Sequence, residues 1–343
     1  MLDIAQSIIV PLVFSIIIAI VLQPVVDFFV RIKINRVIAI VLALFLTVLI
    51  IAAFVALISW QGSRFAESWP MLADKFNGLL NQTITAASGY FDINPQKIHA
   101  WITKAQGEII NTSSAAIGQT LVILSNTVVI LFLLPVYIFL ILFYQPILIE
   151  FIHRCFSTNK QSQVSEIVTQ TKTVIQRYII GLIIEAVLVA TLNTIALLIL
   201  GIDYALLIGI IGGLLNIIPY LGGLVAVALP ILVALATKSS PLYVLYVLAA
   251  YYFIQLVDNN YIVPKIVASK VRINALFALV VVLAGNALWG IPGMFLSLPL
   301  LAIVKVVCDN IESLKPWGFL LGDTMPPILK IKPIFKKIKN KSK

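Results

Sequence analysis

Charged residues are scarce in this sequence. Only 11% of its 343 residues are Asp, Glu, Lys or Arg, and 61% are hydrophobic, whereas a soluble globular protein has about 25% charged residues. The mean hydropathy is +1.07, and the hydrophobic residues form several long runs. These features exclude an ordinary soluble domain and predict an all-α polytopic membrane protein.

Cysteine and histidine are nearly absent, with two residues of each. Cys155 and Cys308 flank different apolar runs, and His99 and His153 lie far apart, so we predict neither a disulfide framework nor a metal site. The sequence also lacks a glycine-rich phosphate loop followed by lysine and any serine–histidine arrangement. We therefore expect no enzyme, no ATP-driven pump and no cofactor, so that any coupling would use a proton or sodium gradient.

The net charge of +10 is concentrated around the apolar runs and in the last fourteen residues, which contain seven lysines. This distribution orients membrane proteins and does not indicate a nucleic-acid partner. We expect the tail to be cytoplasmic, where it fixes the topology or contacts anionic lipid. The first run has no basic start and no small-residue cleavage site, so we predict no cleavable signal.

Seven apolar runs divide the chain. A helix needs about 20 residues to cross the hydrocarbon core once, so five runs predict single spans. The other two, 204–236 and 275–307, are too long for one crossing and too short for two. The seven runs are 8–30, 37–60, 119–144, 178–200, 204–236, 242–257 and 275–307.

The charges between the runs predict the side of each link. The link after the first run contains three basic residues and no acid, so we place it inside. Acids and bases balance in 61–118, which we place outside, and bases dominate 145–177 and 258–274, which we place inside. Each of the two long runs must then return to the side where it began. The simplest interpretation is two re-entrant hairpins from opposite faces; the alternative is two long broken helices that each cross once.

The predicted organisation has five parts. Within the outer segment 61–118, aromatic and aliphatic residues recur at helical spacing, which predicts short amphipathic extracytoplasmic helices. The parts are two spans in 1–60, the amphipathic segment 61–118, spans in 119–200 with a cytoplasmic link at 145–177, a transport core with two interrupted hairpins in 204–307, and a basic cytoplasmic tail in 308–343.

The two long runs are interrupted at equivalent places. Shifted by seventy residues, "NIIPYLGG" lies over "NALWGIPG", so that Asn216 falls on Asn286 and Gly223 on Gly293. With the opposite orientations predicted above, this has the form of an inverted repeat of broken helices, which marks the substrate site in secondary transporters.

The residues at both interruptions suit a binding site. Proline cannot continue a helical hydrogen-bond ladder, glycine permits turns, and the freed backbone groups must be buried in protein or line a wet cavity. Each asparagine adds a donor and an acceptor. The alternative role for these residues is tight helix packing. The predicted substrate-binding residues are Asn216, Pro219, Tyr220, Gly222, Gly223, Asn286, Gly290 and Gly293.

Three further polar residues are candidates for gating or ion coupling. Glu185 lies in the middle of an apolar run, where a carboxylate is costly and usually functional. We predict a proton or sodium site there; the alternative is a protonated acid bonded to a neighbouring helix. Asp258 and Asn260 lie where the run 242–257 ends and are predicted gate residues, although an ordinary polar helix end is the alternative. Asn193 is interpreted as a helix-packing residue.

Several stretches resemble the autoinducer-2 exporter family of bacterial membrane proteins. They include "GIDYALLIGIIGGLLNIIPYLGG", "NNYIVPKIV" and "GIPGMFLSLPLLAIVKVV". The resemblance implies a multi-pass transporter or permease of the bacterial inner membrane that forms homo-oligomers. Members are linked to export of the quorum-sensing signal autoinducer-2, and others to sodium/proton antiport. The matching positions are Pro219 to Gly222, Asn260, Pro264, Gly290, Gly293, Met294 and Pro299.

The sequence departs from the family pattern in three respects. Members usually have an additional apolar span before the one that contains Pro11, and they often have His-Pro where this chain has Asn274 and Ala275. Glu185 stands where an apolar residue is expected. We predict a secondary transporter that exports a small polar metabolite such as autoinducer-2; the alternatives are a cation/proton antiporter and a non-transporting membrane scaffold.

Overall fold

The computed structural model describes residues 6–91, 133–218, 222–238, 240–267 and 273–323. Within these ranges the regular structure is helical, and a π-helical segment, Asp258–Val267, follows α7. The helices are α1 (Gln6–Arg31), α2 (Arg36–Phe91), the helix Leu133–Arg154, α4 (Gln161–Ile199), α5 (Ala205–Asn216), α6 (Gly222–Thr237), α7 (Leu242–Val257), α8 (Ala275–Asn310) and α9 (Lys315–Leu321).

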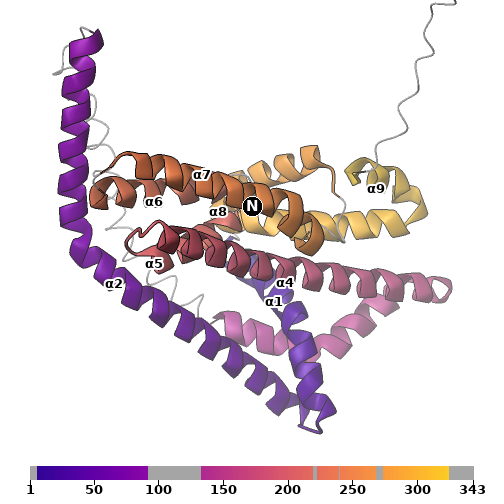
Figure 1. Ribbon diagram of the computed structural model, residues 1–343. Helices are drawn as coiled ribbons and strands as arrows, with labels where there is room; N and C mark the ends of the chain where they lie inside the picture. Colours follow the sequence, from indigo (N-terminus) through magenta and orange to yellow (C-terminus); the bar gives the residue numbers. More distant parts are fainter. Residues whose placement is uncertain (1–5, 92–132, 219–221, 239, 268–272, 324–343) are drawn as a thin grey trace, which may run out of the picture.

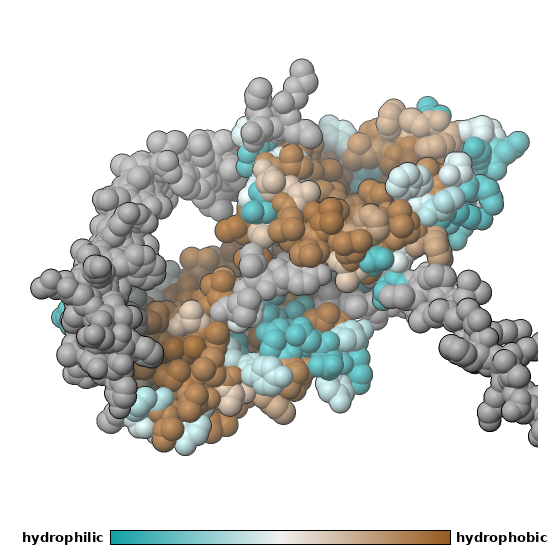
Figure 2. All heavy atoms as spheres, turned by 90° about the horizontal axis from the view of Figure 1, so that it is seen from above, coloured by the Kyte–Doolittle hydropathy of each residue, from teal (hydrophilic) through white to brown (hydrophobic). Residues whose placement is uncertain are grey.

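Six of the described helical segments are long and apolar enough to cross a membrane. Many of their large hydrophobic side chains are exposed, as at Phe45 and Leu198, and Figure 2 shows apolar side chains covering broad areas of the described surface. Water would not tolerate so much exposed apolar surface on a monomer, whereas lipid does. The predicted class, an all-α polytopic membrane protein, is confirmed.

Helix α2 is much longer than the sequence indicated. It contains 56 residues, or about 84 Å at ~1.5 Å per residue, and Figure 1 shows it reaching well beyond the other helices. The boundary expected near residue 60 lies inside α2, because Gly62 and Pro70 do not end it; a proline removes one helical hydrogen bond and permits a bend. Of the predicted amphipathic segment, 61–91 belongs to α2, and 92–118 lies outside the described residues.

The cytoplasmic link expected at 145–177 is also mostly helical. The helix Leu133–Arg154 occupies its first part and α4, with 39 residues, its last part. Polar side chains there bond to other helices: Gln176 Nε2 donates to the carbonyl of Ile20 at 2.6 Å, and Gln163 Nε2 donates to that of Asn310. Two polar side chains of this segment therefore join α4 to α1 and α8, and its predicted cytoplasmic side stays a prediction.

Helices α5 and α6 form the first predicted hairpin. α5 ends at Asn216, and the backbone N–H groups of Ile217 and Ile218 cap it by donating to carbonyls three residues earlier. The chain then returns, since a Cβ atom built at Gly222 would lie 2.6 Å from the Cα atom of Asn216, and one at Gly212 would lie 3.7 Å from the Cβ atom of Ala226. The contacts on both sides of the break confirm a hairpin.

Helix α8 forms the second hairpin. Its backbone leaves helical geometry at Trp289 and Gly290, where φ of Gly290 is +61° and ψ is −143°. A Cβ atom built at Gly285 would lie 2.8 Å from the carbonyl carbon of Gly293, although residues eight positions apart in a straight helix are about 12 Å apart. The two arms of α8 therefore fold back on each other, and the first arm begins at Ala275 just as α5 begins at Ala205, seventy residues earlier.

The tips of the two hairpins meet in one apolar cluster. Ile217 from the first tip and Trp289 from the second pack against buried residues that include Ile179 and Leu296. In Figure 1 the arms of α5 and α6 extend to one side of this region and those of α8 to the other. The structure thus confirms two hairpins that approach each other from opposite directions.

Substituting Gly290 with alanine should destabilise α8. Its φ and ψ angles fall in a region that is essentially confined to glycine, so a Cβ atom would add roughly 1–3 kcal/mol of backbone strain. Nothing lies within 4 Å of that Cβ position, so a steric clash with neighbours does not contribute. A lower melting temperature of the purified Gly290→Ala protein is the expected result; an unchanged one would show that the turn can relax.

The chain beyond α8 folds onto the start of that helix. The backbone N–H of Asn274 donates to the carbonyl of Leu321 at 2.8 Å, and Ile273 pairs with Gly322 in an isolated bridge. The first part of the expected tail 308–343 is therefore ordered helix, and residues 324–343, with most of the lysines, lie outside the described part of the chain.

Candidate functional site

Small residues let α4 and α5 lie unusually close. A Cβ atom built at Gly213 would stand 2.6 Å from the Cβ atom of Ala190, and one at Gly209 would stand 2.8 Å from the backbone nitrogen of Thr194. Such small-residue contacts bring helix backbones together in membrane proteins. Since the register of α4 against α5 is fixed in this way, Glu185 on α4 is placed beside the C-terminal end of α5.

Asn216 joins two acidic side chains from different helices. Its Nδ2 atom donates to Oε1 of Glu185 at 3.1 Å and to Oδ2 of Asp258 at 2.9 Å. Glu185 is 6% exposed and Asp258 is 1% exposed. The two acids are 73 residues apart in the sequence, and the amide at the break between α5 and α6 brings them into one cluster.

The π-helical segment and Gln255 complete the cluster on the side of α7. Asp258 is the first residue of the π-helical segment, and such segments often occur at functional sites. Gln255 Nε2 lies 3.5 Å from Oδ2 of Asp258, and the Gln255 side-chain oxygen contacts the position where Gly223 would carry a Cβ atom. Gln255 therefore lies between Asp258 and the start of α6, which carries a partial positive charge.

The electrostatics of this cluster require neutralisation. Among the described residues, the hydrogen-bond partners of both carboxyl groups are the neutral amides of Asn216 and Gln255. A buried carboxylate is stable only when it is paired, protonated or bound to a cation, and two neighbouring carboxylates repel each other. The arrangement is therefore suited to taking up and releasing a proton or a monovalent cation.

Buried polar atoms continue from the cluster along α4 and α7. Oδ1 of Asp258, Oδ1 of Asn193 and Oη of Tyr251 have no hydrogen-bond partner among the described residues. Asn193 and Tyr251 both lie against Gly212, whose added Cβ atom would be 2.8 Å from Nδ2 of Asn193 and 3.7 Å from Oη of Tyr251. Buried polar atoms of this kind normally bind water or a ligand.

The first hairpin supplies the predicted residues that reach the cluster, namely Asn216 directly and Gly223 through Gln255. Gly222 is buried where the chain turns back and packs against the carbonyl of Leu215. Pro219 and Tyr220 lie outside the described residues.

The second hairpin and Asn260 are placed elsewhere. Asn286 is exposed on the first arm of α8, and Gly290 and Gly293 form the turn and the inter-arm contact of α8. Asn260 is exposed and donates to the carbonyl of Leu256 at 2.8 Å. Their predicted roles in binding or gating stay predictions, and the geometry does not join them to Asn216.

Sequence reasoning separated residues that the fold unites. Glu185 and Asp258 were assigned to ion coupling or gating and Asn216 to substrate binding, yet the three form one hydrogen-bonded group. Tyr251 on α7 is a further buried polar residue of this region, and its spacing of seven residues, about two helical turns, from Asp258 is the signal that could have indicated it. No group of three or more His, Cys, Asp or Glu residues suited to a metal ion occurs in the part of the chain that was searched.

The six apolar helices define a polytopic membrane protein, and paired broken hairpins beside a buried polar cluster are the arrangement that marks the substrate site in secondary transporters. Residues 1–313 match the family described as AI-2E family transporter, and the chain belongs to this family.

Three relatives from two bacterial species carry transport-related names. The chain is 26% identical over 331 residues to the AI-2 transport protein TqsA of Escherichia coli K12, covering 93% of this chain and 90% of that protein. It is 26% identical to the putative transport protein YrrI of Bacillus subtilis, covering 72% and 69%. It is also 26% identical to the putative permease PerM of Escherichia coli K12, covering 78% and 77%.

Proposed function

We propose that this protein is a secondary transporter that exports a small polar metabolite, with autoinducer-2 as the first substrate to test. The observation that carries the proposal is the Asn216 amide, which bridges Glu185 and Asp258 at the break of a hairpin among the apolar helices. The name of the relative TqsA supports the choice of autoinducer-2. The setting we propose is the bacterial inner membrane, with a cytoplasmic C-terminus and a homo-oligomeric assembly.

In this proposal the two functions of the cluster are divided between its members. The Asn216 amide and the end of α5 bind the substrate, because an amide and the terminal helix carbonyls present both donors and acceptors. Glu185 and Asp258 carry the coupling proton or cation, because only they can change charge. Movement of the substrate would come from rocking of the hairpin unit against the remaining helices.

A second candidate function is cation/proton antiport without an organic substrate. The specific observation that favours it is the pair of buried carboxyl groups, one of which has an oxygen without a partner among the described residues. The coupling experiment below separates the two functions.

Counterflow of labelled autoinducer-2 in proteoliposomes tests the transporter proposal. We expect wild-type protein to exchange the label, and the Glu185→Gln and Asp258→Asn proteins to retain exchange, since amides keep similar shape and hydrogen bonding. Both variants should lose the acceleration that a proton or sodium gradient gives, because their side chains cannot carry the balancing charge. Asp203→Asn, at an exposed aspartate between α4 and α5, is the matched control and should behave as wild type.

Each other outcome has a defined meaning. Absence of autoinducer-2 exchange together with sodium-driven proton movement that is lost in Glu185→Gln would favour antiport. Gradient acceleration that survives in both variants would refute the coupling role of the two acids. A protein that moves neither solute, but whose cellular function depends on residues 61–118, would favour the scaffold interpretation.

A further inference from the structure

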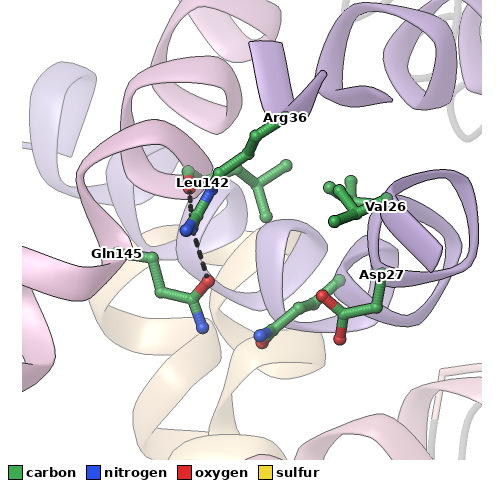
Figure 3. Close-up of a pocket in the computed structure, with 7 residues that line it drawn as sticks. Val26, Asp27, Arg36, Leu142 and Gln145 are labelled. Carbon is green, nitrogen blue, oxygen red and sulfur yellow. Dashed lines mark hydrogen bonds between the residues drawn. The ribbon is translucent and has the colours of Figure 1, made fainter. Parts of the chain in front are cut away.

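A polar pocket lies at the C-terminal end of α1, and none of the residues that line it belongs to the Asn216 cluster. It occupies about 150 Å³ between the last turns of α1, the start of α2 and the helix Leu133–Arg154. Its lining contains one acid, one base and two glutamines between apolar residues (Figure 3). The residues are Gln23, Val26, Asp27, Val30, Arg36, Leu142 and Gln145.

Arg36 forms the basic wall of the pocket. Its Nη2 atom donates to the carbonyl of Leu142 at 2.9 Å and to Oε1 of Gln145 at 3.2 Å. These bonds hold the guanidinium in place against the helix Leu133–Arg154. Arginine has five N–H donors in a planar fork, and because both bonds use Nη2, the other nitrogens keep donors for an anionic group.

Asp27 forms the acidic wall. It projects from α1, and Figure 3 shows its carboxylate across the pocket from Gln145 and Arg36. The ion pairs found in the described part of the chain join other residues, and none links Asp27 to Arg36. The pocket thus presents a negative and a positive group on separate walls, with the Gln145 amide on the side of Arg36.

The surroundings of the pocket are those of a lipid-facing surface. Phe28, Ile32 and Ile147 are 60%, 55% and 63% exposed, and α1 and α2 are both long enough to span a membrane. The pocket lies near the end of α1, next to the basic turn with Arg31 and Lys33, where polar headgroups meet the hydrocarbon. Its volume equals about five water molecules at ~30 Å³ each, which suits a small headgroup.

We propose that this pocket binds the headgroup of a zwitterionic lipid with a primary ammonium group, such as phosphatidylethanolamine. The ammonium of the lipid donates to Asp27, and its phosphate accepts from Arg36. The acyl chains lie along the exposed apolar side chains of α1 and of the helix Leu133–Arg154. A choline headgroup has no N–H to donate to Asp27, and a glycerol headgroup has no positive charge to pair with it.

Native mass spectrometry of the full-length protein, with equal amounts of phosphatidylethanolamine, phosphatidylcholine and phosphatidylglycerol, tests the proposal. Wild type should bind phosphatidylethanolamine with an affinity about tenfold higher than that for either other lipid. A tenfold difference is the contribution expected from one charge-assisted hydrogen bond between the ammonium and Asp27. Asp27→Asn should remove this preference and leave phosphate binding, whereas Arg36→Gln should weaken all three lipids. Asp203→Asn, with an exposed aspartate outside the pocket, should keep the wild-type preference.

Three results would overturn the proposal. The first is equal retention of the three lipids by wild type, and the second is an unchanged preference for phosphatidylethanolamine in Asp27→Asn. The third is displacement of the bound lipid by soluble glycerophosphoethanolamine at the same concentration, which would show that the pocket takes a free zwitterion. Arg36→Gln removes two hydrogen bonds to the helix Leu133–Arg154 and so could prevent folding. Asp27 takes no part in those bonds, so the Asp27→Asn protein alone still tests the proposal.

Discussion

The Asn216→Leu protein is expected to lose substrate counterflow by about 100-fold and to melt at a lower temperature. Leucine has the same branching and number of side-chain heavy atoms but cannot donate, so Oε1 of Glu185 and Oδ2 of Asp258 lose the bonds of 3.1 Å and 2.9 Å to Asn216. Leaving buried acceptors unsatisfied costs about 1–3 kcal/mol each in stability. Loss of the amide that binds substrate removes about 3 kcal/mol from the transport step, which corresponds to about 100-fold in rate. Counterflow in proteoliposomes and thermal melting in detergent measure the two effects.

The matched control is Asn286→Leu, at the equivalent position of the second hairpin. Asn286 is exposed on α8, so the same substitution should change stability by less than about 0.5 kcal/mol and leave counterflow intact. Equal loss of counterflow in both variants would instead support a symmetric site formed by both hairpins. Normal counterflow in Asn216→Leu would contradict the role of the amide bridge.

A second large effect is expected for Gly213→Ala. The new Cβ atom would stand 2.5 Å from the carbonyl oxygen of Ala186 and 2.8 Å from the backbone nitrogen of Ala190. Because both contacts are to backbone atoms, α5 must move away from α4, at a cost of about 1–3 kcal/mol or more. The same movement would separate Asn216 from Glu185, so counterflow should fall together with the melting temperature.

Gly62→Ala in α2 provides the control for this prediction. Nothing lies within 4 Å of the Cβ position at Gly62, and alanine in a helix is more stable than glycine by roughly 0.5–1 kcal/mol. We therefore expect a melting temperature equal to or above that of wild type and unchanged counterflow. If Gly213→Ala behaved like Gly62→Ala, the close approach of α4 and α5 would not fix the geometry of the site.

The hairpins could be predicted from the sequence because their signals are local. The run lengths, the Pro and Gly residues at each interruption and the charge of each link are all read along the chain, and the starts of α5 and α8 at Ala205 and Ala275 keep the offset that the sequence showed. Proline and glycine act on the local backbone, and run length and link charge depend on position in the membrane. None of these effects depends on which helices become neighbours.

The acidic cluster and the length of α2 could not be predicted in the same way. Glu185 reaches Asn216 only because Gly213 and Ala190 set the register of α4 against α5, and that register is a property of packing between distant segments. The segment after residue 60 becomes polar, which suggested a new element, but polarity does not end a helix. The part of α2 around Ser68 is held by Tyr204, through a hydrogen bond and an edge contact with Phe65.

The two ends of the segment from Asn274 to Leu321 lie side by side, joined by a backbone hydrogen bond of 2.8 Å. A segment that leaves the protein where it entered can be exchanged as one piece without changing the path of the remaining chain. Recombination between related genes at these two points would therefore replace the whole second hairpin and leave α4, α5 and α7, with Glu185, Asn216 and Asp258, untouched. The second hairpin and the helices that carry the acids are thus separate pieces of the chain, and each can change in evolution without the other.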